Sequence, residues 1–326
     1  MKANPVTALL VLGSIACAAP VTAQSAGSST EGATFLLLPI GAQGVAMGRA
    51  MTAMTGDESA FWNPAGLASL DRSRIVLLNN ELAVGPSKAA SLLLSRRGVG
   101  TLGFSYLFRD EGDQELRGSA DELLGTLSFR HHLGVISAAA HLFGGLDAGV
   151  NFKVIQFRYT CRGFCDTGGT VATDYAVDAG VQWEPLERAP LRIGVAAANM
   201  GPRFQIINAD QADPLPMRVR VAVAYDVLGG VRAGGDLQGW VTAEVQQRPG
   251  DAGSRSLYVG SELVAGRGDA LSLRIGYIVH DPLDSGASAG LGLQFQRYRV
   301  SVAKSLAVGN LSGVSEPLSV ALSIGF

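Results

Sequence analysis

The sequence predicts an all-β protein, a transmembrane antiparallel β-barrel, on three observations. Hydrophobic residues make up 47% of the 326-residue chain and charged residues 17%, yet the one long apolar stretch lies at the extreme N-terminus. Segments of about ten residues alternate apolar and polar side chains along most of the chain, as the strands of membrane barrels do. The last of these segments ends the chain on an aromatic residue. Because barrel closure satisfies every backbone hydrogen-bonding group in lipid, an apolar chain without spanning helices fits this fold.

Composition and charge exclude several other classes of protein. The chain contains 42 glycines among 326 residues, about 13%, against a typical usage of about 7%. These glycines show no period of three, which excludes collagen, and the low charge excludes a disordered chain. The formal net charge of -2, without a basic tract, argues against nucleic acid as a partner.

The N-terminus has the features of an export signal. Residues 1–23 form the predicted signal peptide, with an apolar stretch over residues 6–19 and a small-residue cleavage site, Val-Thr-Ala, at 21–23. The apolar stretch is short for a spanning helix, which favours cleavage over anchoring. Cleavage leaves a flexible N-terminal segment over residues 24–34. Together with the barrel pattern, export predicts the outer membrane of a diderm bacterium as the location.

The body of the chain alternates with a period of two. In residues 217–227, 174–184 and 271–280, apolar side chains alternate with charged or small ones. Side chains of a strand point alternately to opposite faces, so each segment has one apolar and one polar face. A soluble sandwich would bury the apolar face, whereas a membrane barrel turns it to lipid. The length of the pattern, the small residues on the polar faces, and Tyr and Trp near segment ends favour the barrel.

The alternation predicts fifteen strands. They lie at residues 74–84, 88–96, 99–108, 122–131, 134–143, 147–159, 172–184, 190–200, 217–228, 236–247, 255–265, 269–280, 286–296, 298–306 and 317–326. Single-chain bacterial barrels usually have an even number of strands, so the prediction contains one strand too many or too few. The segment 147–159 is the weakest because its apolar residues change face between Val154 and Ile155, which a β-bulge would explain.

The C-terminal segment carries a signal of its own. Its alternating apolar residues are Val320, Leu322, Ile324 and Phe326. A terminal strand of this form resembles the assembly signal of outer-membrane barrels, which the insertion machinery recognises as an exposed edge. We therefore expect the barrel-assembly machinery and outer-membrane lipid as partners. The alternative is an ordinary amphipathic terminal strand.

Residues 40–70 do not alternate, and they carry a family resemblance. The relevant runs are Gly41-Ala42, Met47-Gly48-Arg49-Ala50 and Asp57-Glu58-Ser59-Ala60-Phe61-Trp62-Asn63-Pro64-Ala65-Gly66-Leu67. Together they resemble the N-terminal signature of the PorV/PorQ family. The Asn-Pro-Ala-Gly element is similar to one in the FadL-type long-chain fatty-acid transporters, to which that family is structurally related. The resemblance is specific over residues 41–67 and is carried elsewhere by length, strand pattern and the terminal phenylalanine.

The resemblance implies a barrel of about 14 strands with a small N-terminal plug or hatch. The plug would span residues 35–71 and the barrel residues 72–326. The structural motif of this plug consists of Gly48, Asn63, Pro64 and Gly66. Glycine lets backbones pack closely, and Asn-Pro sets a turn before the first strand.

Two acidic residues of the plug suggest how it is held. We expect Asp57 and Glu58 to act as caps or to face arginines in the lumen of the barrel. The candidate partners are Arg218, Arg220 and Arg274.

The resemblance implies binding or transport rather than catalysis. We predict a PorV/PorQ-like component associated with type IX secretion, a cargo shuttle or accessory, whose partners are secretion subunits or secreted cargo. The first alternative is a FadL-like conduit for hydrophobic small molecules such as long-chain fatty acids, and the second is a structural outer-membrane barrel. A cargo-binding barrel should have large extracellular loops, but the longest predicted gaps, residues 109–122, 160–171 and 201–216, are modest.

No catalytic, cofactor-binding or metal site is predicted. Residues 98–103 match GxGxxG and residues 286–290 match GxSxG, but both continue as strands where a helix is required. His131 and His132 are adjacent on one strand and so face opposite sides, and the other two histidines have no partner at ligand spacing. We expect a protein that is not an enzyme and holds no cofactor.

The chain has three cysteines. Cys17 lies in the signal peptide, where lipidation is an alternative to cleavage. Cys161 and Cys165 lie close together in a loop-like segment, and in an oxidising compartment they most simply form a disulfide.

Overall fold

The computed structural model describes residues 31–82, 85–164, 169–185, 190–206, 212–228, 237–266, 268–281, 285–306 and 318–326. The predicted signal peptide and most of the predicted segment 24–34 lie outside the described residues. In these described ranges no helix is long and apolar enough to cross a membrane.

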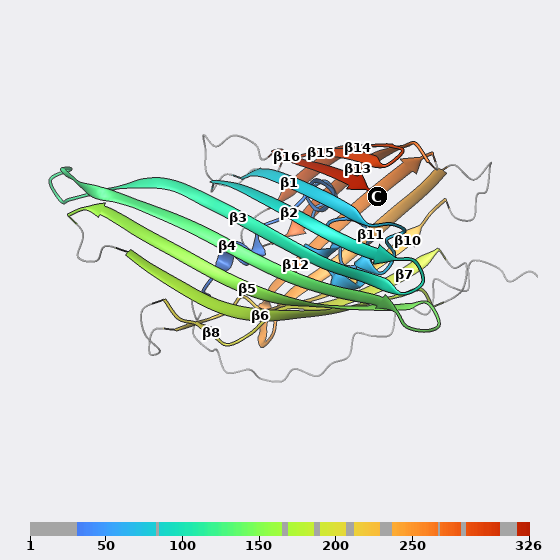
Figure 1. Ribbon diagram of the computed structural model, residues 1–326, viewed down its shortest axis with the longest axis horizontal. Helices are drawn as coiled ribbons and strands as arrows, with labels where there is room; N and C mark the ends of the chain where they lie inside the picture. Colours follow the sequence, from blue (N-terminus) through green and yellow to red (C-terminus); the bar gives the residue numbers. More distant parts are fainter. Residues whose placement is uncertain are drawn as a thin grey trace, which may run out of the picture.

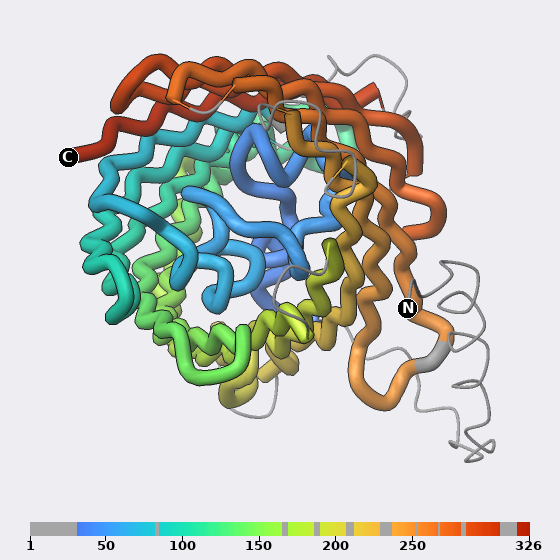
Figure 2. The backbone as a smooth tube through the Cα atoms, turned by 90° about the vertical axis from the view of Figure 1, so that its right-hand side faces the viewer, coloured from blue at the N-terminus to red at the C-terminus, as the bar shows by residue number. Residues whose placement is uncertain are grey.

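Within the described residues, fourteen antiparallel strands close into a barrel (Figures 1 and 2). They are β1 (Arg74–Leu82), β2 (Gly85–Arg96), β3 (Gly100–Arg117), β4 (Leu123–His141), β5 (Leu146–Gly163), β6 (Gly169–Trp183), β7 (Leu191–Met200), β10 (Arg218–Asp226), β11 (Leu237–Arg248), β12 (Asp251–Ala265), β13 (Ala270–His280), β14 (Gly286–Phe295), β15 (Tyr298–Ser305) and β16 (Leu318–Gly325). Strand β16 pairs with β1 and closes the ring. Between β7 and β10, β8 (Arg203–Phe204) and β9 (Asp213–Pro214) form a separate two-stranded sheet. The predicted all-β barrel of about 14 strands is confirmed.

The sequence predicted one strand too many because it divided β4. Residues 122–131 and 134–143 belong to one strand, whose His132 and Leu133 continue the pairing with β5 without interruption. The suspected segment 147–159 lies in β5, and the described pairs of β5 with β4 and β6 contain no register shift, so the predicted bulge is wrong. The change of face there has another cause: Ile155 is an inward residue of the core shared by wall and plug.

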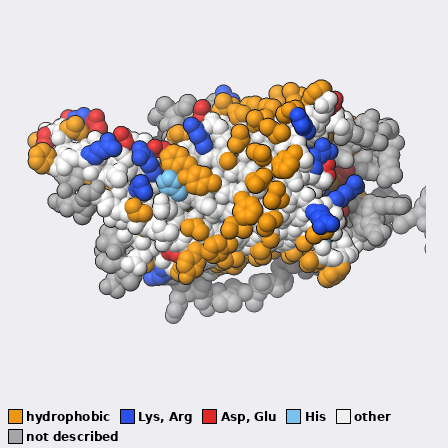
Figure 3. Space-filling model, in the orientation of Figure 1, with side chains coloured by type: hydrophobic (Ala, Val, Ile, Leu, Met, Phe, Trp, Pro, Cys, Tyr) orange, Lys and Arg blue, Asp and Glu red, His pale blue; other side chains and the backbone are white. Residues whose placement is uncertain are grey.

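The outer surface of the barrel is a band of exposed apolar side chains (Figure 3). Members from around the ring, each more than a third exposed, are Leu77, Phe104, Ile136, Val154, Val195, Val223, Val245, Ile275, Leu293 and Val302. The inward residues between them are mostly small or polar. This arrangement reverses that of a soluble sandwich and is the pattern of a barrel surrounded by lipid.

The two ends of the barrel differ. We call the end where β1 begins at Arg74 and β16 ends at Gly325 the terminal rim, and the opposite end the far rim. Strands β3, β4 and β5 have 18, 19 and 18 residues, against 8 in β15 and β16, and with β6 they extend beyond the far rim (Figure 1). Much of the predicted gaps 109–122 and 160–171 is therefore strand.

The chain between residues 31 and 73 lies inside the barrel (Figure 2). This segment, the plug, contains η2 (Thr34–Leu37), α1 (Ala42–Ala46), η3 (Ser59–Phe61) and η4 (Pro64–Leu67). Its apolar side chains share buried clusters with inward residues of the strands. Because these helical elements have at most five residues, packing against the wall stabilises them rather than helix propensity.

Candidate functional site: the plug and the inner wall

The Asn-Pro-Ala-Gly element fastens the plug to β6. The side chain of Asn63 caps η4 by accepting a hydrogen bond from Ala65 N–H at 3.1 Å, and Pro64 occupies the first turn, where a missing N–H costs nothing. The Asn63 amide also donates to the carbonyl oxygens of Thr52, at 2.7 Å, and Val181, at 3.2 Å. Asn63 is fully buried. It therefore joins two parts of the plug to the wall.

Glycines on the inner wall let the plug approach the strands closely. A Cβ at Gly180 of β6 would overlap Asn63, and one at Gly149 of β5 would overlap the backbone of Pro64. On the other side of the bore, a Cβ at Gly276 of β13 would overlap the backbone nitrogen of Gly48. The same close approach occurs at Gly194, Gly260 and Gly290. Part of the unusual glycine content is therefore explained by contact between plug and wall.

Gly48 and Gly66 have matching roles on the plug itself. Gly48 has a φ of +59°, which favours glycine, and a Cβ there would lie 2.6 Å from Tyr277 N. A Cβ at Gly66 would lie 2.6 Å from the hydroxyl of Ser59. The four motif residues predicted from the sequence thus all lie at tight contacts of the plug.

Glu58 organises the start of α1. Its two carboxylate oxygens accept hydrogen bonds from the backbone N–H groups of Gln43, at 3.0 Å, and Gly44, at 2.9 Å. Negative charge at a helix start is favourable. Burial opposes the charge more strongly, and it raises the pKa of Glu58 to about 7. This carboxyl group therefore titrates near neutral pH.

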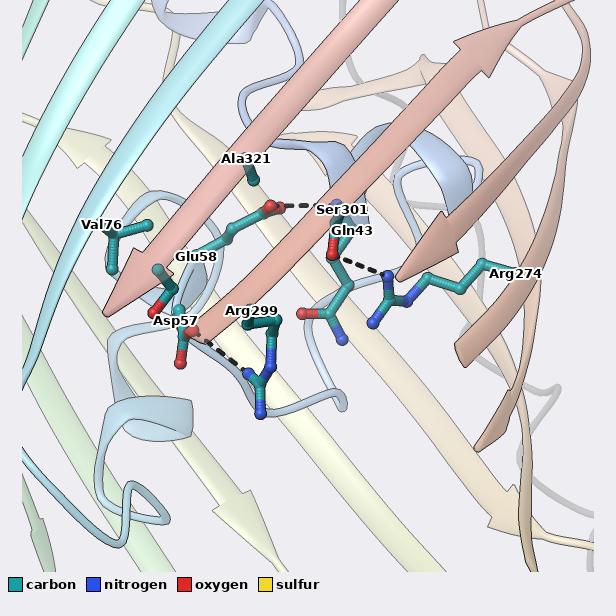
Figure 4. A pocket seen from close by; sticks show the side chains of 9 residues that line it. Gln43, Asp57, Glu58, Val76, Arg274, Arg299, Ser301 and Ala321 are labelled. Carbon is teal, nitrogen blue, oxygen red and sulfur yellow. Dashed lines mark hydrogen bonds and ion pairs between the residues drawn. The ribbon is translucent and has the colours of Figure 1, made fainter. Parts of the chain in front are cut away.

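Asp57 ties the plug to the wall near the seam of the barrel (Figure 4). Its carboxylate lies 3.3 Å from Arg74 Nε, at the start of β1, and 3.1 Å from Arg299 Nη1 on β15. Both Asp57 and Arg74 are buried. Between Glu58, Arg274 and these groups lies a cavity of about 20 Å³, room for about one water molecule. The contact is thus closely packed and polar.

The predicted arginine partners of the acidic pair are only partly correct. Arg274 lines the same cavity as Glu58, but its guanidinium pairs with Glu262 at 2.6 Å. Arg218 binds Glu31 instead, with both Nη atoms 2.7 Å from its carboxylate oxygens. Arg220 lies over the ring of Trp62, 5.5 Å from the centroid. Pairing across a barrel depends on closure and strand tilt, which local sequence does not reveal.

The larger aliphatic side chains of the inner wall gather on one side of the bore. They are Val76 and Leu78 of β1, Leu93 of β2, Leu107 of β3, Leu133 and Val135 of β4, and Ile155 of β5. Buried charged residues lie on both sides of the bore: Arg220, Glu244, Glu262 and Arg274 on β10–β13, and Arg74, Arg109 and Lys153 among the aliphatic residues of β1–β5. The lumen thus has one side that is richer in large aliphatic side chains, which we call the apolar wall.

A cluster of rings lies at the far-rim end of the apolar wall. His131 stacks on Phe35 of the plug at 4.4 Å between ring centroids, and Phe157 lies 5.3 Å from His131. Phe204 of β8 adds an edge contact to Phe157 at 6.5 Å. These four residues, the aromatic cluster, belong to the same buried core as the apolar wall or pack on it. Apolar side chains therefore extend from the far rim to the plug, with the buried Arg109 beside His131 in the strand register.

Solved structures share this fold. The toluene transporter TodX of Pseudomonas putida matches with a TM-score of 0.60 and 11% identity, over 88% of this chain and 99% of that one. The toluene transporter TbuX of Ralstonia pickettii gives 0.58 and 12%, over 90% and 100%. A FadL homologue of Pseudomonas aeruginosa gives 0.56 and 10%, over 89% and 99%. The chain has the FadL-like fold.

At identities of 10–12%, the similarity of these solved structures to this chain shows the fold alone. No family model and no curated protein matches the sequence. The Asn-Pro-Ala-Gly element, whose similarity to FadL-type transporters the sequence suggested, lies in the plug of a FadL-like barrel here.

The other residues singled out in the sequence are the two cysteines and the C-terminal residues. Cys161 is disulfide-bonded, while Cys165 lies outside the described residues, so their pairing stays a prediction. Of the C-terminal residues, Val320, Leu322 and Ile324 lie on β16 opposite β1, and Phe326 follows the strand. Their role as an assembly signal stays a prediction.

Sequence reasoning missed several plug contacts. Glu244 of β11 accepts from Thr52 N–H at 2.8 Å, and Asn151 of β5 donates to the carbonyl of Ala60 at 2.8 Å. One available signal was the recurrence of glycine on the polar face of successive strands. In the part of the chain that the structure describes, no group of three or more His, Cys, Asp or Glu side chains could hold a metal ion.

Proposed function

We propose that this FadL-like barrel lies in the outer membrane and conducts small hydrophobic molecules across it. The observation that carries the proposal is the cluster of apolar side chains that extends from the aromatic cluster along the apolar wall to the plug. Burial on such a surface favours an apolar solute by about 25 cal/mol per Å² and gives a sugar or ion nothing comparable. Two of the fold relatives are toluene transporters, which supports the same class of ligand by analogy.

Passage through this barrel requires the plug to move. The plug occupies the bore (Figure 2), and the cavity beside Glu58 has room for only about one water molecule. A Cβ at Gly290 of β14 would lie 2.6 Å from the Cβ of Ala46, so cysteines at these positions form a disulfide once plug and wall separate by about 1 Å, to the usual Cβ–Cβ distance of about 3.5–4.5 Å. The pair A46C/G290C would therefore lock the plug to the wall.

The test measures uptake of radiolabelled toluene and of a long-chain fatty acid by cells that carry the barrel. We expect uptake with the wild type, a large loss with oxidised A46C/G290C, and recovery when the disulfide is reduced. The wild type with and without reductant controls for the native disulfide at Cys161. Equal uptake by the oxidised and reduced variant, or by cells with and without the barrel, would contradict the proposal.

The extended strands support a second candidate, the accessory role in type IX secretion. Strands β3–β6 project beyond the far rim and offer a larger surface to a protein partner than the short loops that the sequence suggested. Purification of the tagged barrel from outer membranes tests this candidate. Recovery of secretion subunits or secreted cargo, lost when residues 112–126 are removed, would favour it, and recovery of acyl chains alone would favour the conduit.

A further inference from the structure

The outer face of β1–β6 changes from apolar to polar at one level. Strand register places in one outward row, paired across neighbouring strands, Asn79, Lys88, Phe108, His132, Gln156 and Thr173. The outward residues one step nearer the terminal rim include Leu77, Tyr106 and Val154, which belong to the apolar band. In a membrane barrel, aromatic residues and the end of the apolar band mark the level of the lipid headgroups.

Positive charge gathers in this row and just beyond it. Arg130 of β4 and Arg158 of β5 are directly opposite each other in the register, and like charges in that position repel. Arg130 has one acidic neighbour, Asp110, at 3.1 Å. Arg158 and Lys88 are exposed and have no acidic partner among the described residues. The face of the barrel thus carries three cations against two carboxylates, Asp110 and the exposed Glu81 of β1, and Figure 3 shows basic side chains beside the apolar surface at this end.

An apolar groove of about 600 Å³ adjoins the positive residues on the lipid-facing surface. Leu77 of β1, Val320 and Leu322 of β16, and Tyr106 of β3 line it, with the small Ala90 among them. Lys88 and Phe108 also line this groove, and both belong to the outward row that runs from Asn79 to Thr173. The Tyr106 hydroxyl lies 2.6 Å from His132 Nδ1, which joins the groove to the arginine-bearing strands.

We propose that this face binds a phosphate-bearing glycolipid of the lipid A class in the outer leaflet. Acyl chains would lie in the groove, and the phosphates would meet Lys88, Arg130 and Arg158. Guanidinium groups bind phosphate through paired hydrogen bonds, and two phosphates remove the repulsion between the opposed arginines. The far rim faces outward in this proposal, since barrel strands are joined by the longer loops on the extracellular side.

Native mass spectrometry of the detergent-solubilised full chain tests the proposal, with diphosphorylated lipid A as the probe. We expect R130Q/R158Q to bind about thirtyfold more weakly than the wild type, from the usual contribution of basic residues near anionic headgroups. R130K/R158K keeps the charges and should retain most of the affinity. The matched control R96Q/R97Q removes two exposed arginines at the terminal rim and should bind like the wild type.

A second arm separates a lipid from free phosphate. A90F fills the groove and should weaken lipid A binding without changing the binding of inorganic phosphate. If R130Q/R158Q binds lipid A as tightly as R96Q/R97Q while both remain folded, the proposal is wrong. It is also wrong if inorganic phosphate binds the wild type as tightly as lipid A does and A90F changes neither. Neither outcome depends on whether the barrel transports hydrophobic molecules.

Discussion

The absence of a side chain at Gly276 decides how closely the plug approaches β13. A Cβ there would overlap the backbone of Gly48, which cannot move away as a flexible side chain could. We therefore expect G276A to weaken plug docking by about 1–3 kcal/mol, the usual cost of overpacking. Limited proteolysis of the plug in the folded barrel measures this change.

Gly134 of β4 provides the matched control for this substitution. It also lies within a strand, but a Cβ there would have nothing within 4 Å. G134A should therefore leave the plug as protease-resistant as in the wild type. Equal resistance of G276A and G134A would show that the close approach of Gly48 does not limit docking.

Glu58 makes plug docking depend on pH. Its pKa is raised from the usual 4.5 to about 7 in the folded protein, so the folded state holds a proton that the unfolded state releases between these values. The contribution of Glu58 to the stability of the folded protein is therefore complete below pH 4.5 and is lost as the pH rises through 7. We expect the plug to resist protease better at pH 5 than at pH 8. The corresponding difference in the free energy of plug docking is at most about 3 kcal/mol.

The variant E58Q tests the assignment of this pH dependence. Because an amide does not titrate, E58Q should flatten the difference in protease resistance between the two pH values. D121N removes an exposed carboxylate at the tip of the strand extension and should leave the difference unchanged. A pH dependence that persists in E58Q would assign the effect to another group.

At the scale of elements, alternation located the strands well where lipid faces them. The segment 269–280 was predicted and β13 spans Ala270–His280, because one face must be apolar along its whole length. The far-rim end of β3 was missed, since beyond the membrane charged residues occupy both faces and the register shifts between Asp110 and Asp113. The division of β4 has a related origin: its adjacent histidines interrupt the apolar alternation although the pairing continues.

The candidate site could be predicted only in part for a similar reason. The plug motif lies in contiguous residues, so the sequence revealed Asn63 and Glu58. The partners on the wall come from strands far apart in sequence, and closure and tilt decide which inward residue meets the plug. Arg299 rather than Arg220 therefore meets Asp57.

At the scale of the whole molecule, two carboxylates hold the plug at separate parts of the ring. Asp57 pairs with Arg74 and Arg299 beside the seam of β1 and β16, and Glu31 pairs with Arg218 and Arg248 on β10 and β11. Removing one partner of a buried ion pair leaves an uncompensated charge and costs about 3–5 kcal/mol. A plug deprived of both carboxylates should therefore leave the bore for part of the time.

We accordingly expect D57N/E31Q to make the barrel permeable to small sugars, measured as the swelling rate of liposomes that contain it. The wild type should admit little, because the plug fills the bore and the cavity beside Glu58 has room for only about one water. E115Q removes a carboxylate from an exposed pair with Arg117, where such pairs contribute at most about 1 kcal/mol, and should swell like the wild type. Swelling of D57N/E31Q no faster than E115Q would mean that packing alone, through the wall glycines and the buried core, keeps the plug in place.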